Sequence, residues 1–179
     1  MKEHEYWESL GKSACPDDIA RDLSIEAIKK WIPKNANVLD LGCGNGYCTF
    51  KFNELKNASI LGVDYSSSSV EAAKKFLQIS DIKNKNEIAF KVGSALDLSD
   101  YYKKFNTVIT IRCLINVGDF DTQVKALRQI HKSLDYNGIY LMCENVISGL
   151  NLTNQFRSKI GLSEIKTRWH NNYLDEEKF

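Results

Sequence analysis

The chain has 179 residues, with 24 lysines and arginines against 23 aspartates and glutamates, a formal net charge of +1. This length suits one domain with a sizeable core, and the balanced charge gives no global sign of a nucleic-acid or anionic-membrane partner. No apolar run approaches the length of a membrane span, and the charged first residues lack the pattern of a signal peptide. Five cysteines at spacings that match no metal motif are expected to be reduced thiols of a cytoplasmic protein, with no metal site.

Strand-like and helix-like patterns alternate along the chain. The first clear element is a helix over 19–31, ended by Pro33, in which apolar residues recur at helical spacing: Ile19, Leu23, Ala27, Ile28 and Trp31. Apolar and amphipathic runs then predict strands at 38–41, 59–64, 87–92, 107–111 and 139–143, and helices at 47–55, 70–78 and 123–134. The last helix is expected to end at Asn137-Gly138 and to hold His131 as a structural histidine. This alternation predicts a parallel, doubly wound α/β sheet with strands buried on both faces.

The C-terminal region is less regular. A helix is expected over 149–160, and a polar and aromatic run follows at 168–173. Residues 175–179 resemble the first turn of a further helix, at which the sequence ends. That ending suggests a truncated chain.

The most informative segment is the glycine-rich turn after the first strand. Gly42, Gly44 and Gly46 stand between strand 38–41 and a helix, and glycine lets the backbone turn sharply beside a ligand. Open α/β sheets hold nucleotide-like ligands at such a turn. Asp64 ends the second strand, where a carboxylate can accept hydrogen bonds from ribose hydroxyls. The spacing is one residue short of the dinucleotide fingerprint, and no P-loop lysine follows, so these residues predict an adenosine-type ligand and leave the rest of it open.

The sequence V-L-D-L-G-C-G-N-G at 38–46 resembles motif I of the class I S-adenosylmethionine-dependent methyltransferases. Later family motifs are similar, in the same order and spacing, to 61–66, 92–98, 105–109 and 127–141. The resemblance covers residues 36–145 and implies a Rossmann-like methyltransferase sheet, mostly parallel, in which the family's final strand hairpin is not visible. It implies three parts: an N-terminal helical cap over the cofactor site (1–34), the α/β core (35–148) and a substrate-side C-terminal segment (149–179).

The resemblance also implies a cofactor, S-adenosyl-L-methionine, and the residues that bind it. Asp40 would hold the methionine end of the cofactor and Asp64 its ribose. Arg112 would lie near the methyl group or form a surface ion pair. Ser94 stands where the family often has an acid for the adenine amine, so that contact is expected to be weaker, and Asp97 is interpreted as a turn residue. The predicted cofactor-binding residues are Asp40, Gly42, Cys43, Gly44, Gly46, Asp64, Tyr65, Ser94, Ala95 and Arg112.

The implied activity is in-line transfer of the sulfonium methyl group to a small molecule or a sugar. The near-neutral charge and the absence of an N/D-P-P-Y/F motif after the fourth strand argue against a nucleic-acid partner. His170 is the leading candidate for a general base, ahead of Glu144 and His4, and Tyr6-Trp7 is either a lid over the cofactor or a packed end. Two alternatives stay open: a cofactor-binding protein without turnover, and a nicotinamide-dependent oxidoreductase, which the glycine spacing disfavours.

Overall fold

Five parallel strands form the centre of the protein. The computed structural model describes residues 17–56 and 58–178. Its sheet has the order β3-β2-β1-β4-β5 and all four pairings are parallel, so the predicted doubly wound sheet is confirmed. The strands are β1 (Asn37–Leu41), β2 (Ser59–Asp64), β3 (Ile88–Val92), β4 (Phe105–Ile111) and β5 (Leu134–Cys143).

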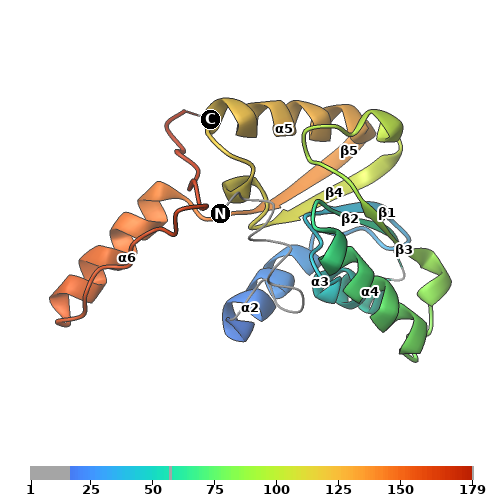
Figure 1. The fold of residues 1–179 in the computed structure, drawn as a ribbon, viewed down its shortest axis with the longest axis horizontal. Helices are drawn as coiled ribbons and strands as arrows, with labels where there is room; N and C mark the ends of the chain where they lie inside the picture. The colour runs from blue at the N-terminus through green and yellow to red at the C-terminus, as the bar shows by residue number, and fades with distance from the viewer. Residues whose placement is uncertain (1–16, 57, 179) are drawn as a thin grey trace.

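Helices cover both faces of this sheet (Figure 1). α5 (Phe120–Ser133) lies on one face, while α2 (Asp18–Lys29), α3 (Tyr47–Lys56) and α4 (Ser67–Ile79) lie on the other. Burial alternates along the strands: Leu39 and Val108 pack with α5, whereas their neighbours Val38 and Ile109 pack with α2 and α3. Because side chains on a strand point alternately to the two faces, a sheet covered on both faces needs the continuous apolar runs that the sequence contains. Short 3-10 helices lie in the connections: η1 (Lys85–Glu87), η2 (Ser99–Tyr101) and η3 (Leu114–Asn116).

Of the apolar stripe predicted for the first helix, α2 buries Ile28 but not the other large residues. Ile25 and Ile28 are buried against the sheet, whereas Ile19, Leu23 and Trp31 are 76%, 65% and 68% exposed. The contact of α2 with α3 and the sheet decides which residues of α2 are buried, and the sequence of the helix alone does not contain this information.

The end of α5 also differs from the prediction. The helix ends at Ser133 and β5 begins at once, so Asn137-Gly138 lies inside the strand rather than at a helix end. Asn137 has a φ of +66°, and the β4–β5 pairing shifts register between Phe105 and Thr107. These residues therefore form an irregularity in the strand, which is another place where Asn and Gly are favoured. The prediction for His131 is wrong as well, because this residue is exposed.

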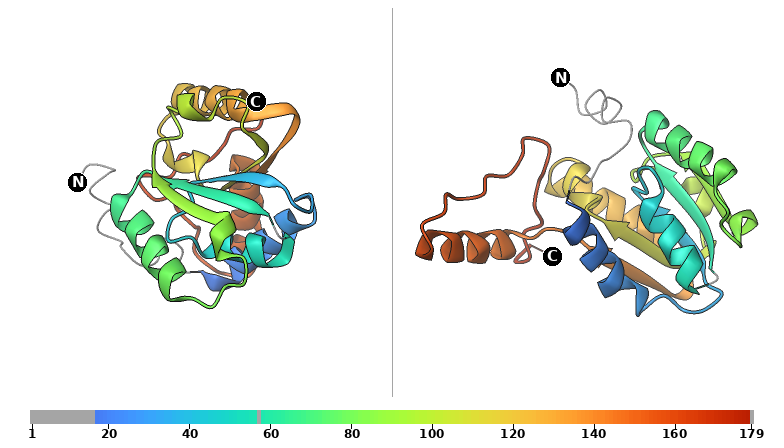
Figure 2. Two further views of the ribbon diagram at one scale, coloured as in Figure 1. Left: turned by 90° about the vertical axis from the view of Figure 1, so that its right-hand side faces the viewer. Right: turned by 90° about the horizontal axis from the view of Figure 1, so that it is seen from below.

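α6 (Ile147–Lys159) projects from the sheet, and the chain after it returns alongside the helix toward the sheet (Figures 1 and 2). The returning chain is anchored where Leu174, 1% exposed, forms a parallel bridge with Val146. Residues 175–178 form a turn closed by the Lys178 N–H and the Asp175 carbonyl at 3.0 Å, and the expected helix is not found there. Within residues 17–56 and 58–178, no reversed strand follows β5.

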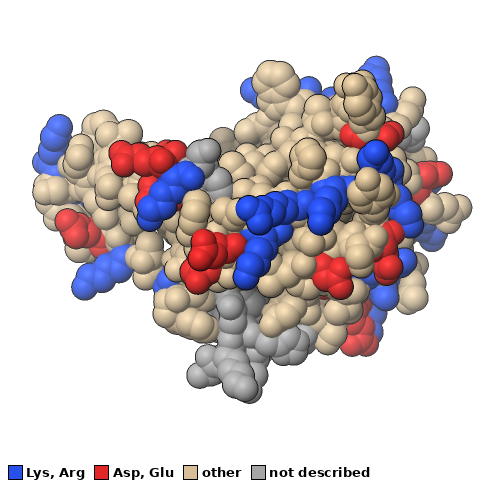
Figure 3. Space-filling view, turned by 90° about the horizontal axis from the view of Figure 1, so that it is seen from above, with Lys and Arg blue, Asp and Glu red and all other residues tan. Residues whose placement is uncertain are grey.

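Charges of both signs are mixed over the surface drawn in Figure 3, where acidic side chains lie beside the basic ones. Of the helices in the described part of the chain, none combines the length and the apolar character that crossing a membrane would require.

Candidate functional site

A cavity of about 460 Å³ opens at the carboxyl ends of the strands. Its walls come from the segments that follow each of the five strands, from the start of α2 and from residues 168–171. This volume is typical of small-ligand sites, and the carboxyl edge of an open α/β sheet is where such sites are found.

The glycine turn between β1 and α3 forms the floor of the cavity. Gly42 and Gly46 have φ values of +77° and +81°, in the left-handed region that favours glycine. A Cβ on Gly42 would come within 2.7 Å of Cys113 Sγ, and one on Gly46 within 2.7 Å of the Phe90 ring. A Cβ on Gly44 would meet nothing within 4 Å, because this residue faces open space. The turn thus needs glycine for its backbone and its packing, and leaves a ligand room to approach.

Asp64, at the end of β2, is fixed by the same turn. Its Oδ2 accepts the Gly44 N–H at 2.7 Å, and its Oδ1 accepts the Ser66 N–H at 2.9 Å. A carboxylate offers about four lone-pair sites, so both oxygens retain capacity to accept hydrogen bonds from a ligand. Tyr65 lies next to it, 46% exposed, and also lines the cavity.

Asp40 is a buried carboxylate in the cavity wall, only 2% exposed. Thr49 Oγ1 donates a hydrogen bond to its Oδ2 at 2.5 Å. Burial raises the pKa of Asp40 from 3.8 to about 6; the Thr49 hydrogen bond opposes this rise and the nearby charge of Asp64 adds to it. A buried carboxylate beside a cavity is unfavourable alone and favourable beside a cation, so this part of the site suits a positively charged ligand.

Cys43 contributes its backbone to the cavity wall, while its thiol packs inside the protein. The side chain is 7% exposed, and a Cβ on Gly62 would lie 2.9 Å from its Sγ. Burial, with the charges of Asp40 and Asp64, raises the pKa of this thiol well above its ordinary value. Because the reactive form of cysteine is the thiolate, this side chain has the character of a packing group.

The segment after β3 lines the far end of the cavity with Ser94 and the buried Ala95. Ser94 Oγ accepts the Leu96 N–H at 3.1 Å, which occupies part of its acceptor capacity. Asp97 is exposed and accepts the Ser99 N–H at 3.2 Å, so its interpretation as a turn residue is confirmed.

Arg112 follows β4 and lines the opposite end of the cavity. Its φ is +53°, which is uncommon for a residue with a side chain. The Arg112 N–H donates to the Cys143 carbonyl at 2.9 Å, and Asn116 Nδ2 donates to the Arg112 carbonyl at 2.8 Å. Within the part of the chain that the structure describes, Arg112 forms no ion pair, so the surface ion pair is not found there.

Glu144, a candidate base in the sequence analysis, forms structural hydrogen bonds to the protein backbone. Its carboxylate accepts the backbone N–H groups of Cys113 at 2.9 Å, Leu114 at 3.0 Å and Ile115 at 3.4 Å. Burial raises the pKa of Glu144, and these hydrogen bonds oppose the rise. The carboxylate holds the turn that carries Arg112, and it does not line the cavity.

His170 reaches the cavity from the C-terminal segment, where it is 4% exposed. The segment is held by the Asn172 N–H, which donates to the Ile115 carbonyl at 2.7 Å, and by Gln123 Nε2, which donates to the Asn172 carbonyl at 2.8 Å. Burial lowers the pKa of His170, and the charge of Arg168 lowers it further. The imidazole is therefore neutral at pH 7, the state that a proton acceptor requires.

Comparison with known proteins identifies the family. A family model described as "Methyltransferase domain" matches residues 32–172. The chain belongs to this methyltransferase family. An uncharacterised protein of Rickettsia prowazekii is 36% identical over 125 residues, which are 69% of this chain and 48% of that protein. The ubiquinone biosynthesis O-methyltransferase of Pelagibacter ubique is 34% identical over 123 residues, 69% of this chain and 47% of that enzyme.

A third relative differs in its named substrate. The tRNA U34 carboxymethyltransferase of Campylobacter fetus subsp. fetus is 36% identical over 107 residues, 59% of this chain and 35% of that enzyme. The chain thus spans about half, or less, of the length of these relatives.

Solved structures share the fold of this methyltransferase domain. An S-adenosylmethionine-dependent methyltransferase from Methanosarcina mazei superposes with a TM-score of 0.69 at 18% identity, covering 85% of this chain and 79% of that one. The glycopeptide N-methyltransferase MtfA, crystallised with S-adenosyl-L-methionine, gives a TM-score of 0.59 at 23% identity, covering 67% of this chain and 52% of that one.

The methyltransferase domain brings the predicted cofactor residues to one cavity, and His170 with them, except for Gly46, which packs against Phe90 behind the turn and does not line it. His4 and Tyr6-Trp7 lie outside the described residues. The cavity also has polar residues that the sequence analysis did not identify: Asp17, Arg21, Asn116, Asn145, Arg168 and Asn171. In the sequence, the charged first turn of α2 and the polar residues around His170 could have indicated a functional role. Their position beside the glycine turn, however, depends on the fold.

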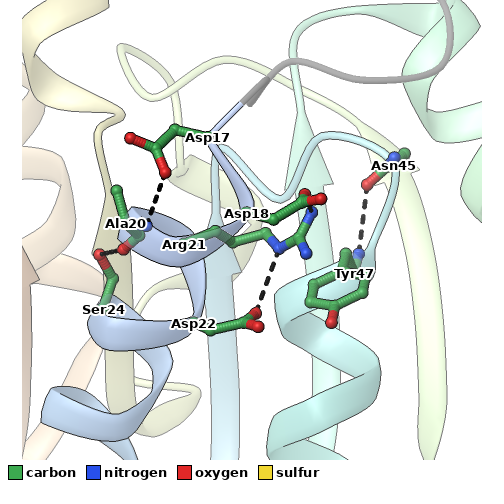
Figure 4. A network of polar contacts seen from close by, with 8 residues as sticks. All are labelled: Asp17, Asp18, Ala20, Arg21, Asp22, Ser24, Asn45 and Tyr47. Carbon is green, nitrogen blue, oxygen red and sulfur yellow. Dashed lines mark hydrogen bonds and ion pairs between the residues drawn. The ribbon is translucent and has the colours of Figure 1, made fainter.

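Arg21, one of these unpredicted residues, is held by several side-chain contacts (Figure 4). Its guanidinium lies 3.7 Å from the centre of the Tyr47 ring and forms ion pairs with Asp18 at 2.7 Å and Asp22 at 3.5 Å. Tyr47 begins α3 directly after the glycine turn. The start of α2 is thus joined to the helix at the glycine turn, and it closes one side of the cavity.

Proposed function

We propose that the protein is an S-adenosyl-L-methionine-dependent methyltransferase that acts on a small molecule or a sugar. One observation carries the proposal: Asp40, Asp64 and the left-handed glycine turn converge on one cavity of about 460 Å³. The family membership and the fold shared with MtfA support the same cofactor.

The residues present fit this cofactor. Gly44 leaves an open approach over the turn, where a Cβ would otherwise stand. The cofactor carries a positive sulfonium and an ammonium group, which suit the ionised form of Asp40. Asp64 would accept the ribose hydroxyls, and Ser94 with the backbone of Ala95 would contact the adenine. When bound, S-adenosyl-L-methionine supplies a methyl group that is activated by its neutral thioether leaving group.

The protein's own part in the reaction is to orient the acceptor and to receive its proton. We assign the second task to His170, which is buried, lines the cavity and is neutral at pH 7. An acceptor hydroxyl would transfer its proton to the imidazole as the new bond to carbon forms. Glu144 and the turn over 113–115 would fix the wall against which the acceptor lies. Holding acceptor and methyl group in line lowers much of the barrier.

The three-part organisation is part of this proposal. Asp17 and Arg21 line the cavity from the N-terminal side, as a cap over the cofactor would. Residues 168–171 line it from the C-terminal side, as a substrate wall would.

A small acceptor is favoured over nucleic acid by charge. The net charge is +1, and acidic side chains lie beside the basic ones on the face in Figure 3. Proteins that bind nucleic acid usually gather lysines and arginines on one face. The relatives carry both kinds of name, an O-methyltransferase of ubiquinone biosynthesis and a tRNA carboxymethyltransferase, so the acceptor requires direct measurement.

Two experiments test the proposal. Calorimetric titration with S-adenosyl-L-methionine, S-adenosylhomocysteine and NAD should show binding of both sulfur ligands and not of NAD; the reverse pattern would favour an oxidoreductase. Incubation with methyl-tritiated cofactor should label a bacterial small-molecule extract and leave total tRNA unlabelled. Labelled tRNA would contradict the acceptor class, and binding without any labelled product would favour a cofactor-binding protein without turnover, as the neutral Ser94 would permit.

A further inference from the structure

We propose that Arg112 and Arg168 form a subsite for a carboxylate that lies next to the transferred carbon, an inference that rests on the proposed methyl transfer. Two different molecules can bring a carboxylate to this place. The carboxylate belongs either to the acceptor or to the group that the sulfonium transfers.

The acidic and the basic residues of the cavity come from different segments of the chain. Its acidic lining residues, Asp17, Asp40 and Asp64, come from the start of α2 and the ends of β1 and β2. The end of β4 and the C-terminal segment contribute Arg112 and Arg168 and no lining carboxylate. The acidic part suits the sulfonium and ammonium groups of the cofactor, and the basic part suits an anion.

Neither arginine of this basic part is neutralised by the protein. Among the described residues, no carboxylate lies within 4.0 Å of the guanidinium of Arg112 or Arg168. Arg21, the third arginine of the cavity, is different because it pairs with Asp18 and Asp22. Arg112 is partly buried and Arg168 is exposed, and both line the cavity, where two cations without a carboxylate partner are complementary to an anionic ligand.

The backbone at Arg112 is built to place this side chain. A φ of +53° is costly for any residue with a Cβ and persists only where the surroundings impose it. Here the hydrogen bonds to Cys143 and from Asn116 hold the peptide groups on both sides of Arg112. Glycine would adopt this conformation without strain. The strained backbone and its two hydrogen bonds therefore fix the point from which the Arg112 side chain leaves the turn at the cavity.

Arg168 is held close to the same place by the folded C-terminal segment. The Asn171 N–H donates to the Arg168 carbonyl at 3.0 Å, and the Asn172 N–H donates to Ile115 in the turn that follows Arg112. Arg168 also lies near enough to His170 to lower its pKa. A guanidinium presents a planar set of donors that matches a carboxylate, so two of them can hold one carboxylate firmly.

Asn116 supports the backbone of Arg112. Its Nδ2 is used by Arg112, and its Oδ1 is buried and accepts no hydrogen bond from the described residues. Asn116 lines the cavity, but this oxygen is inaccessible to solvent, so the part of Asn116 in the site is to hold the Arg112 backbone through Nδ2.

The test compares Arg112→Gln and Arg168→Gln with the wild type and with Arg128→Gln, an exposed arginine of α5 that does not line the cavity. S-Adenosylhomocysteine should bind Arg168→Gln and Arg128→Gln as tightly as the wild type, which separates this test from the failure of the proposed function. If the wild type does not bind it, the proposed function and this inference fail together.

The donor arm measures the affinity for S-adenosyl-L-methionine and for its carboxymethyl sulfonium analogue, carboxy-S-adenosyl-L-methionine. The acceptor arm saturates the protein with S-adenosylhomocysteine and titrates 4-hydroxybenzoate against 4-hydroxybenzamide, and glucuronate against glucuronamide. In one of the two arms, the compound with the extra carboxylate should bind roughly tenfold more tightly than the compound without it. A factor of this size corresponds to the free energy of one charge-assisted hydrogen bond. Both cavity variants should lose this preference, and Arg128→Gln should keep it.

Three results would overturn the subsite. The first is the absence of a carboxylate preference in both arms. The second is a preference that survives in both cavity variants. The third is that Arg112→Gln weakens the binding of S-adenosylhomocysteine but not that of 5′-methylthioadenosine, which lacks the amino-acid part of the cofactor. Arg112 would then bind the cofactor's own carboxylate.

Discussion

Replacing Asp40 by asparagine should stabilise the free protein while weakening cofactor binding. Asp40 is 2% exposed, and burial raises its pKa from 3.8 to about 6. Above pH 6 the folded protein therefore holds an ionised carboxylate in a place that disfavours charge. Asparagine has nearly the same shape, and its Oδ1 can still accept the hydrogen bond from Thr49.

The size of the effect follows from the two pKa values. Because the folded pKa is higher than the unfolded one, the folded state binds the proton more tightly, and this stability is fully present below about pH 4. It is lost as the pH rises through about 6. The interval from 3.8 to about 6 corresponds to roughly 3 kcal/mol of unfolding free energy. Asp40→Asn should thus match the wild type at pH 4 and exceed it by up to roughly 3 kcal/mol at pH 8.

Urea unfolding at pH 4 and pH 8, without ligand, measures this difference, and calorimetry at pH 8 measures the loss of affinity for S-adenosyl-L-methionine. Asp97→Asn is the control: its side chain is exposed and its pKa is lowered by hydrogen bonds to Ser99, so the same change should not stabilise the protein at pH 8. Equal destabilisation by Asp40→Asn at both pH values would refute the reasoning. So would unchanged cofactor affinity.

Three further substitutions test separately the backbone of the glycine turn, the hydrogen bonds of Glu144 and the proposed base His170. Gly42→Ala should lower the free energy of unfolding by about 1–3 kcal/mol, because φ is +77° and the new Cβ would lie 2.7 Å from Cys113 Sγ. Glu144→Gln should cost about 1–3 kcal/mol, because its amide oxygen can replace Oε1 but its N–H₂ group would face the Ile115 N–H that Oε2 accepts. His170→Gln should slow methyl transfer by about 10²–10⁴-fold and leave the affinity for S-adenosylhomocysteine unchanged. Urea unfolding checks the first two, and tritium transfer with calorimetry checks the third.

Each change has a matched control. Gly44→Ala has the same backbone strain without the clash and should destabilise less than Gly42→Ala. Glu71→Gln, on the exposed face of α4, and His131→Gln, on the exposed face of α5, should have little effect. Equal destabilisation by the two glycine changes would remove the packing argument. Full turnover in His170→Gln would remove the base.

The strands and the cofactor side of the cavity could be predicted because their signals are local. The glycine turn, Asp40 and Asp64 are fixed by the residues immediately around them, and continuous apolar runs indicate strands covered on both faces. What failed depended on contacts between distant segments. Of the apolar residues predicted to face the core from the first helix, only Ile28 is buried, and it packs together with Ile25, which was not predicted.

The acceptor side of the cavity was harder to predict for the same reason. Arg168 and Asn171 reach it only because the chain returns past α6 and docks on Ile115. Glu144 has a carboxylate where a base could stand, but three backbone N–H groups from a turn about thirty residues earlier occupy it. His170 was predicted from its polar surroundings, and its role in proton transfer stays a prediction.

The most direct test of the cofactor site is calorimetric titration of S-adenosyl-L-methionine into the wild type and Asp64→Ala. The change removes the two acceptors proposed for the ribose and the anchor of the Gly44 N–H. Binding to the wild type and a loss of affinity of roughly tenfold or more in the variant is the expected result. Undiminished binding by Asp64→Ala, or no binding by the wild type, would contradict it.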